Sequence, residues 1–214
     1  AGVSVNRIDD TVNASVSGGT LNLKDLDIRS KASQTIRTIG AAGSGGASFG
    51  VSGSVAVNKI NTVNSAFIDG NASITAEDNV GVVAQTDDNL MNYAGLLSVG
   101  GNAGIGAAVG VNHILGDTEA RIENAAVSAK GLGAGITADS VVSDDKMNDG
   151  FISDQSVNIG YTLEQQRSAV TKTGVVVDSS ATHTLKSFIA NAAGAGTAAL
   201  AGTVNVSQID GNTN

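Results

Sequence analysis

The feature that most constrains the fold is a short phrase, Val-x-Val-Asn/Ser-x-Ile, that recurs four times along the 214-residue chain. Self-similarity at a regular period indicates a stacked repeat architecture, in which each unit buries its apolar residues against its neighbours. Such a scaffold usually works as an extended surface. The polar member of the phrase marks the repeat position, and it is Asn6, Asn58, Asn112 and Ser207.

The spacing of these four residues is regular at first and then fails. Asn6 and Asn58 are 52 residues apart, Asn58 and Asn112 are 54 apart, and Asn112 and Ser207 are 95 apart. Repeat units therefore start near residues 1, 53, 107 and 202, and either one repeat has degenerated or the third unit carries an insertion of roughly forty residues. The period breaks over residues 139–173, which we interpret as the insertion.

Alternating residue types predict β-strands in the regular part of the repeats. Val51, Val55 and Val57 alternate with small or polar residues at a period of two, which is typical of a half-buried strand. Turn sequences at residues 69–71 and 77–79 separate successive runs. We therefore predict an all-β fold, a right-handed parallel β-helix (β-solenoid), with ordinary hairpins as the alternative.

The size of one coil follows from an assumed coil length. If a coil takes ~20 residues and rises ~4.8 Å, the chain forms about ten coils and a rod roughly 50 Å long. One repeat unit would then span two to three coils. In this interpretation the valines of the phrase face inward, and its Asn lies at a turn that ends the strand, where it bonds the backbone or the next coil.

Two segments also fit an amphipathic helix. Apolar residues fall at helical spacing in residues 90–97 and again in residues 185–192. Both segments precede a glycine-rich stretch, as residues 35–39 do in the first unit. We predict strands at all three places because equivalent positions of a repeat should share a structure.

The insertion is the candidate site of function. Its residues 139–154 carry five acids against the single Lys146, and good helix formers follow at residues 161–170. We interpret it as an excursion made of an acidic loop and at most one short helix. Insertions in repeat proteins often lie on the binding face, and a tolerated loop without function is an equally weighted alternative. The candidate binding residues are Asp139, Asp144, Asp145, Asp149, Phe151, Asp154 and Tyr161.

Composition excludes several classes of function. The chain has no cysteine, which excludes a disulfide framework and thiolate chemistry. Its net charge is −8, so a basic nucleic-acid footprint is missing. No apolar run approaches the ~20 residues that a transmembrane helix needs. Neighbouring acids such as Asp9 and Asp10 raise the question of calcium, but no calcium-binding nonapeptide or EF-hand loop is present. We expect no cofactor, with Asp144, Asp145 and Asp149 as weak candidate ligands if calcium binds.

Catalytic signals are weak. His113 and His183 are the only histidines, and His113 occupies the repeat position of Arg7 and Lys59, which indicates a surface position. No nucleophile elbow surrounds any serine. We therefore do not expect an enzyme. The alternative is a polysaccharide-processing β-helix enzyme that uses acids beside Arg or Lys.

The repeats resemble those of very large secreted bacterial proteins. The unit around residues 104–122, Gly-Ile-Gly-Ala-Ala-Val-Gly-Val-Asn-His-Ile-Leu-Gly-Asp-Thr-Glu-Ala-Arg-Ile, looks like repeats of filamentous-haemagglutinin-type and leukotoxin-like filamentous adhesins. The resemblance covers nearly the whole chain except the insertion. It implies a right-handed parallel β-helix passenger, exported by type V secretion through an outer-membrane transporter and displayed as a fibre. It supplies no catalytic residues.

These expectations combine into one functional hypothesis. The chain is a single β-solenoid segment, residues 1–214, of a longer secreted or surface-displayed adhesin of the autotransporter or filamentous-haemagglutinin kind. It would act as a rigid stalk or as a surface that binds a host or bacterial cell-surface receptor, protein or glycan. A leukotoxin-like toxin fragment is a second alternative. The absence of a recognisable cap after Ile209 leads us to expect an internal piece of a passenger.

Overall fold

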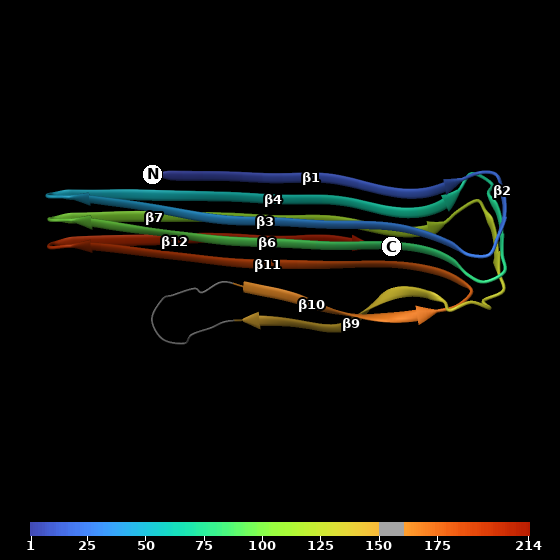
Figure 1. Ribbon diagram of the computed structural model, residues 1–214. Coiled ribbons are helices and arrows are strands. Elements are labelled where there is room, and N and C mark those ends of the chain that lie inside the picture. The colour runs from blue at the N-terminus through green and yellow to red at the C-terminus, as the bar shows by residue number, and fades with distance from the viewer. Residues whose placement is uncertain (150–160) are drawn as a thin grey trace.

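The structure is a flattened parallel β-solenoid. This computed structural model describes the backbone of residues 1–149 and 161–214, and the side chains of residues 1–138 and 169–214. Each coil consists of a long strand, a short strand and a second long strand, and Figure 1 shows the long strands side by side along the length of the molecule. The two long layers face each other, while the short strands close one end.

Four strands form the first long layer, which we call sheet A. They lie in the order β1-β4-β7-β12 and all pair in parallel. Their bounds are β1 Gly2–Ser17, β4 Phe49–Asp69, β7 Ala103–Ile122 and β12 Ala198–Thr213. In the register, Asn6, Asn58, Asn112 and Ser207 are direct neighbours, so the recurring phrase is stacked on itself.

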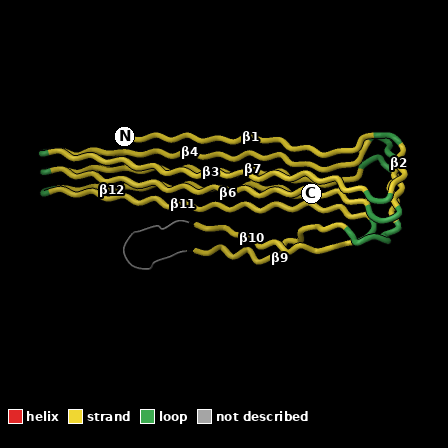
Figure 2. The backbone as a smooth tube through the Cα atoms, viewed as in Figure 1, coloured by secondary structure: helices red, strands yellow, loops and turns green. Residues whose placement is uncertain are grey.

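The facing layer, sheet C, continues each coil. Its three parallel strands are β3 Leu26–Gly46, β6 Val80–Gly100 and β11 Val175–Ala195. The short strands β2 Thr20–Leu23, β5 Ser73–Ala76 and β8 Ala126–Ala129 form the small sheet at one end. At the opposite end, two-residue turns such as Ala47–Ser48 join the two layers directly (Figure 2).

The prediction of an all-β solenoid is confirmed, whereas the predicted coil size is wrong. One repeat of 52 to 54 residues is one coil, because residues that far apart pair directly across neighbouring strands. The long strands reach 21 residues, which corresponds to about 70 Å of extended chain. The solenoid therefore has few, very wide coils, and it grows by ~4.8 Å per coil at right angles to its strands.

The inserted excursion is a β-hairpin. Its strands, β9 Ile136–Asp149 and β10 Tyr161–Lys172, pair with each other in antiparallel fashion. In the chain they follow β8 and precede β11. The short helix that the sequence left open at residues 161–170 is absent, since β10 covers that segment. Pairing with β9 satisfies the backbone of β10, so tertiary context outweighs its helix propensity. Residues 90–97 and 185–192 lie in β6 and β11, which confirms the strands predicted there.

The base of the hairpin is packed against the solenoid. Ile136 and Ala138 of β9 form a small core with Val83 and Val176 on the outer side of sheet C. Residues Val80 to Ala84 are consequently buried on both faces of β6, unlike the alternating pattern of the rest of that strand. The hairpin is therefore anchored to the solenoid at its base.

The inward and outward faces are opposite to those predicted. Val3 and Val5 are 74% and 69% exposed, whereas Asn58 and Ile60 are completely buried. The phrase itself contains the reason: its Asn and Ile are two residues apart, so they share one face of a strand, and its valines occupy the other. Burying the isoleucine ladder Ile8, Ile60, Ile114 and Ile209 therefore brings the asparagines inside.

The interior alternates between apolar and polar layers. One apolar cluster lies beside the small sheet, a second contains Ile36, Ile60, Leu90, Ile114 and Leu185, and a third contains Ala94, Leu96, Ala108 and Ile189. Buried Asn, Ser, Thr and Asp side chains occupy the rows between them. Because buried polar groups need partners, these rows fix the register of the coils more strictly than an apolar core would.

Candidate binding surfaces

The recurring asparagines form a hydrogen-bonded ladder inside the solenoid. Asn6 donates to Asn58 Oδ1 at 2.9 Å, and Asn58 donates to Asn112 Oδ1 at 2.9 Å. Asn112 Nδ2 then reaches Ser207 Oγ at 3.3 Å. Thr38 of the facing sheet also donates to Asn58. The expected bond to the next coil is thus present, but these residues lie within strands, so the turn position predicted for them is wrong.

Breaking this ladder at its centre should cost stability. Replacing Asn58 with alanine removes one acceptor and one donor, so Asn6, Thr38 and Asn112 each lose one hydrogen bond. We expect the free energy of unfolding to fall by about 2–3 kcal/mol, measured by urea denaturation. The matched control is Asn61→Ala on the same strand, whose side chain bonds Asp9 on the exposed face. An equal loss in both variants would contradict a role for the interior ladder.

A second polar layer contains a buried acid and a buried histidine. Asp88 and His183 are register partners on β6 and β11. His183 Nδ1 lies 3.2 Å from Asp88 Oδ2, which is an ion-pair distance without the alignment of a hydrogen bond. The Asp88 side chain is 0% exposed and that of His183 is 9% exposed. Thr62 donates to the other carboxylate oxygen, at 3.1 Å.

Missing side chains in sheet A make room for this histidine. A Cβ on Gly116 would lie 2.5 Å from His183 Cε1, and one on Gly211 would lie 3.0 Å from Nε2. The imidazole is therefore cradled between two glycines. Because Thr62 donates to Asp88 and not to His183, the group is not arranged as a nucleophile activated by a base. The observed contacts of His183 are packing contacts with Asp88 and the two glycines.

The residues that directly follow Asn6, Asn58, Asn112 and Ser207 form a polar ladder on the outer face of sheet A. Arg7, Lys59, His113 and Gln208 are register neighbours, which places His113 on the surface as predicted. His113 Nε2 lies 2.9 Å from Asp210, and this contact, with a smaller one from Gln208, holds the pKa of Asp210 below its ordinary value. Arg7 lowers the pKa of Asp9 in the same way, by hydrogen bonding.

The acid pairs Asp9–Asp10 and Asp87–Asp88 do not each converge on one ion. Asp10 and Asp88 point inward, while Asp9 and Asp87 lie on the outer faces, because successive residues of a strand alternate. Asp10 accepts a hydrogen bond from Gln34. In the part of the chain whose side chains are described, no group of three or more His, Asp or Glu could hold a metal. The same part contains no helix long and apolar enough to span a membrane.

The predicted binding residues lie in or beside the hairpin. Asp139, Asp144, Asp145 and Asp149 are on β9, and Tyr161 begins β10, directly opposite Asp149. The side chains of these five residues lie outside the described part, as do Phe151 and Asp154 altogether. Binding by the excursion, and calcium binding by Asp144, Asp145 and Asp149, stay predictions.

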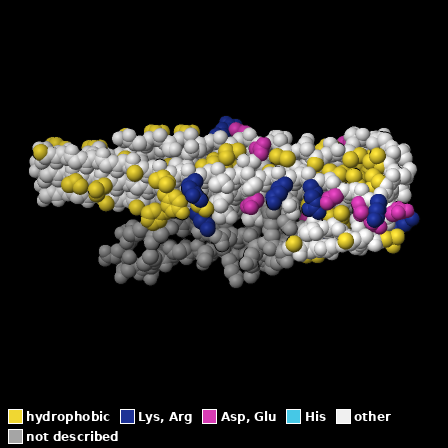
Figure 3. All heavy atoms as spheres, viewed as in Figure 1, with side chains coloured by type: hydrophobic (Ala, Val, Ile, Leu, Met, Phe, Trp, Pro, Cys, Tyr) yellow, Lys and Arg dark blue, Asp and Glu magenta, His cyan; other side chains and the backbone are white. Residues whose placement is uncertain are grey.

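An exposed apolar patch with flanking cations lies on sheet C. The register aligns Ile39, Tyr93 and Phe188 across the three strands, and Arg37, Met91 and Lys186 two positions away. Ile39 is 77% exposed, and Tyr93, Leu97 and Val99 are also exposed. Figure 3 shows hydrophobic side chains gathered beside Lys and Arg over β3, β6 and β11. We call Ile39, Tyr93 and Phe188 the aromatic patch. Sequence reasoning missed it because the wrong coil length misaligned the strands.

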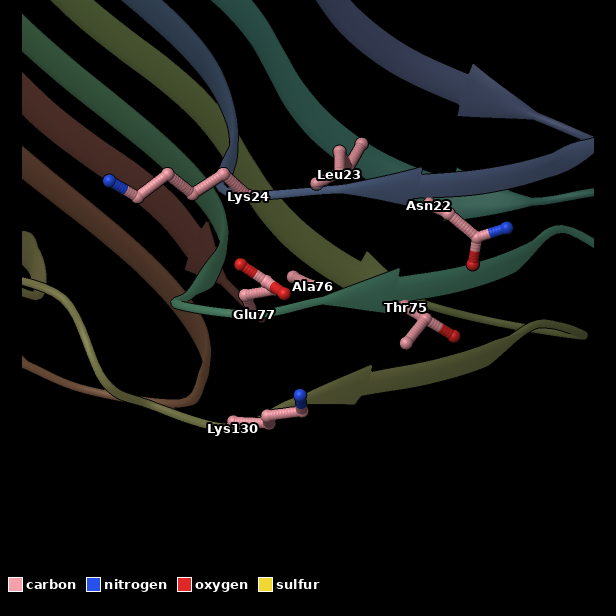
Figure 4. A pocket seen from close by; sticks show the side chains of 7 residues that line it. All are labelled: Asn22, Leu23, Lys24, Thr75, Ala76, Glu77 and Lys130. Atoms are coloured by element: carbon pink, nitrogen blue, oxygen red, sulfur yellow. The ribbon is translucent and has the colours of Figure 1, made fainter.

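A shallow hollow lies on the small sheet. It has a volume of about 350 Å³ and is lined by Asn22, Leu23, Lys24, Thr75, Ala76, Glu77 and Lys130. Figure 4 shows these side chains coming from successive coils at the ends of β2, β5 and β8. Lys24 Nζ is 3.8 Å from Asp78, a long ion pair. The two cations, one acid and two uncharged polar groups suit a small polar or anionic group better than an apolar one.

Comparison with known proteins does not assign a function to the chain. No protein-family model, curated protein or solved structure matches the chain.

Proposed function

We propose that this chain is a segment of a secreted or surface-displayed bacterial adhesin. The solenoid acts as a rigid stalk, and its outer surface binds a receptor, protein or glycan, on a host or bacterial cell. The resemblance of the repeats to filamentous adhesins supports this proposal, and so does the absence of cysteine. During secretion the partner would be an outer-membrane transporter.

The observation that carries the proposal is that one sequence repeat forms one coil of the solenoid. Each unit of 52 to 54 residues adds one complete coil. Side-chain ladders such as Asn6, Asn58 and Asn112 bind this coil to the previous one. A chain built this way gains length by adding coils, and every coil offers the same outward positions again. This is the behaviour expected of a fibre that holds binding surfaces away from a cell.

The aromatic patch is the binding surface we assign to this function. Its rings and aliphatic side chains lie on an unbroken sheet, so little conformational entropy is lost on binding. Arg37 adds a cationic side chain at its border. Aromatic and arginine side chains are the residue types that most often dominate binding energy at interfaces.

The test is binding of the purified, fluorescently labelled chain to cultured host cells and to bacterial cells. We expect saturable binding that Tyr93→Ser weakens about fivefold or more. The matched control is Val63→Ser, since Val63 is exposed to a similar degree on the outer face of sheet A. Deletion of residues 139–173 measures the share of the hairpin in the same assay.

Two results would contradict the proposal. Equal cell binding by Tyr93→Ser and the wild type would remove the aromatic patch from it. Release of oligosaccharides from bacterial or host polysaccharides by the purified chain would favour the polysaccharide-processing enzyme instead.

A further inference from the structure

The outer face of sheet A carries a continuous area without polar side chains. The outward positions of β4 from Phe49 to Val57, and their register partners on β1, β7 and β12, are all apolar residues or glycine. We call this area the valine face. It consists of Phe49, Ala103 and Ala198; Val51, Ile105 and Leu200; Gly53, Ala107 and Gly202; Val3, Val55, Val109 and Val204; and Val5, Val57, Val111 and Val206.

The valine face is large for an exposed apolar surface. Its five rows span about 34 Å along the strands, and its three to four strands span about 14–19 Å, which gives on the order of 550 Å². Soluble monomers rarely expose a larger contiguous apolar patch, and such patches usually mark an interaction site. A two-fold contact that pairs four of its five rows buries roughly 800 Å² in total, which is the size of a weak, transient interface.

The relief of the valine face is complementary to itself. Val51, Ile105 and Leu200 form a ridge of large side chains, and the adjacent row of Gly53, Ala107 and Gly202 forms a furrow. A two-fold axis midway between these rows places the ridge of each copy in the furrow of the other. Such an isologous contact uses the same area on both partners and closes at two copies.

The charges beside the valine face agree with this arrangement. The cationic row with Arg7, Lys59 and His113 borders only one side of the face. A two-fold axis between ridge and furrow carries that row to the opposite side, beyond Phe49, where the partner has the glycine-rich turn. Like charges therefore do not meet across the interface.

We infer that the valine face docks a second copy of this chain, sheet A against sheet A, with ridges seated in furrows. The inference goes beyond the proposed function, since it concerns association in solution and not binding to cells. Flat sheets pack face to face about 10 Å apart, which short β-branched and small side chains allow. In a surface fibre, the contact would join neighbouring fibres laterally.

Sedimentation velocity across the micromolar range tests the inference. We expect a monomer–dimer equilibrium in the wild type that Ile105→Asp shifts at least about tenfold toward monomer. The matched control is Val99→Asp on β6, since Val99 and Ile105 are 48% and 46% exposed and both lie on central strands. This control should leave the dissociation constant unchanged. Circular dichroism establishes that each variant keeps its strand content.

A second variant distinguishes the ridge-and-furrow contact from general stickiness. Gly53→Leu fills the furrow with an apolar side chain, and the monomer has room for it, because a Cβ there meets no heavy atom nearer than the Ala107 carbonyl oxygen at 3.7 Å. We expect it to weaken the dimer. A stronger dimer with Gly53→Leu, a purely monomeric wild type, or association insensitive to Ile105→Asp would each overturn the inference.

A lipid surface is the competing occupant of a flat apolar area. Co-sedimentation with phosphatidylcholine vesicles separates the two. Vesicle binding that Ile105→Asp abolishes and Gly53→Leu strengthens, without a dimer in solution, would replace the second copy by a membrane.

Discussion

Replacing His183 with alanine should lower the free energy of unfolding by about 3–5 kcal/mol. The substitution removes the imidazole that contacts Asp88, whose carboxyl group is completely buried, and opens a cavity between Gly116 and Gly211. Removing one side of a buried polar contact costs more than the contact contributes, because the remaining polar group is left without that partner in a medium of low polarity. Urea denaturation followed by circular dichroism gives the measurement.

Two further variants define the cause of that loss. His113→Ala is the matched control, because His113 also lies beside an aspartate, Asp210, but on the exposed face, where an ion pair contributes little. Adding Asp88→Asn to His183→Ala should restore part of the stability, since the amide oxygen still accepts from Thr62 and carries no charge. No recovery in this double variant would attribute the loss to the cavity alone.

Gly50→Val should destabilise the fold by about 3 kcal/mol or more. Gly50 faces the interior at the end where the two long layers approach most closely. A Cβ there would lie well inside van der Waals contact with the Val99 carbonyl oxygen and 2.7 Å from the Val99 carbonyl carbon. Because these are backbone atoms of the facing strand, no side-chain rotation can relieve the clash. Thermal denaturation gives the measurement.

The matched control is Gly53→Val, three residues along the same strand. Gly53 faces outward, and a Cβ there makes only ordinary contacts, the nearest at 3.7 Å. Valine has a higher β-propensity than glycine, so this variant should be neutral or stabilising by up to about 1 kcal/mol. Similar losses in both variants would show that the spacing of the two layers does not depend on the inward glycines.

The fold class could be predicted from the sequence because its signals are local and repeated. Alternation along residues 51–58 predicts a strand wherever the chain folds, and the period of 52 to 54 residues predicts stacking. The same period marked where an excursion leaves the repeat. A short helix in the excursion stayed open, however, since good helix formers at residues 161–170 give no sign that β9 will pair with them.

The candidate surfaces could not be predicted because they depend on which residues become neighbours. With coils assumed to be ~20 residues long, Ile39, Tyr93 and Phe188 had no reason to meet, nor had Asp88 and His183. Once one repeat is known to be one coil, their alignment follows from the register. The sequence did contain one signal that could have corrected which face of the strand is buried. Asn58 and Ile60 are two residues apart, so they lie on the same face of the strand, and burying the isoleucine also buries the asparagine.

The sequence by itself determined that this chain is a stack of β-strands with a regular period and one interruption, since periodicity and turn chemistry are properties of the chain alone. Only the tertiary structure decided the length of a coil and the direction in which Val3, Asn6 and Ile8 point. Both depend on the facing sheet. Its glycine-rich end lets the two layers approach closely, and its polar side chains form hydrogen bonds with the asparagine ladder. The exposure of the valines is the consequence, and it creates the face that we infer joins two copies.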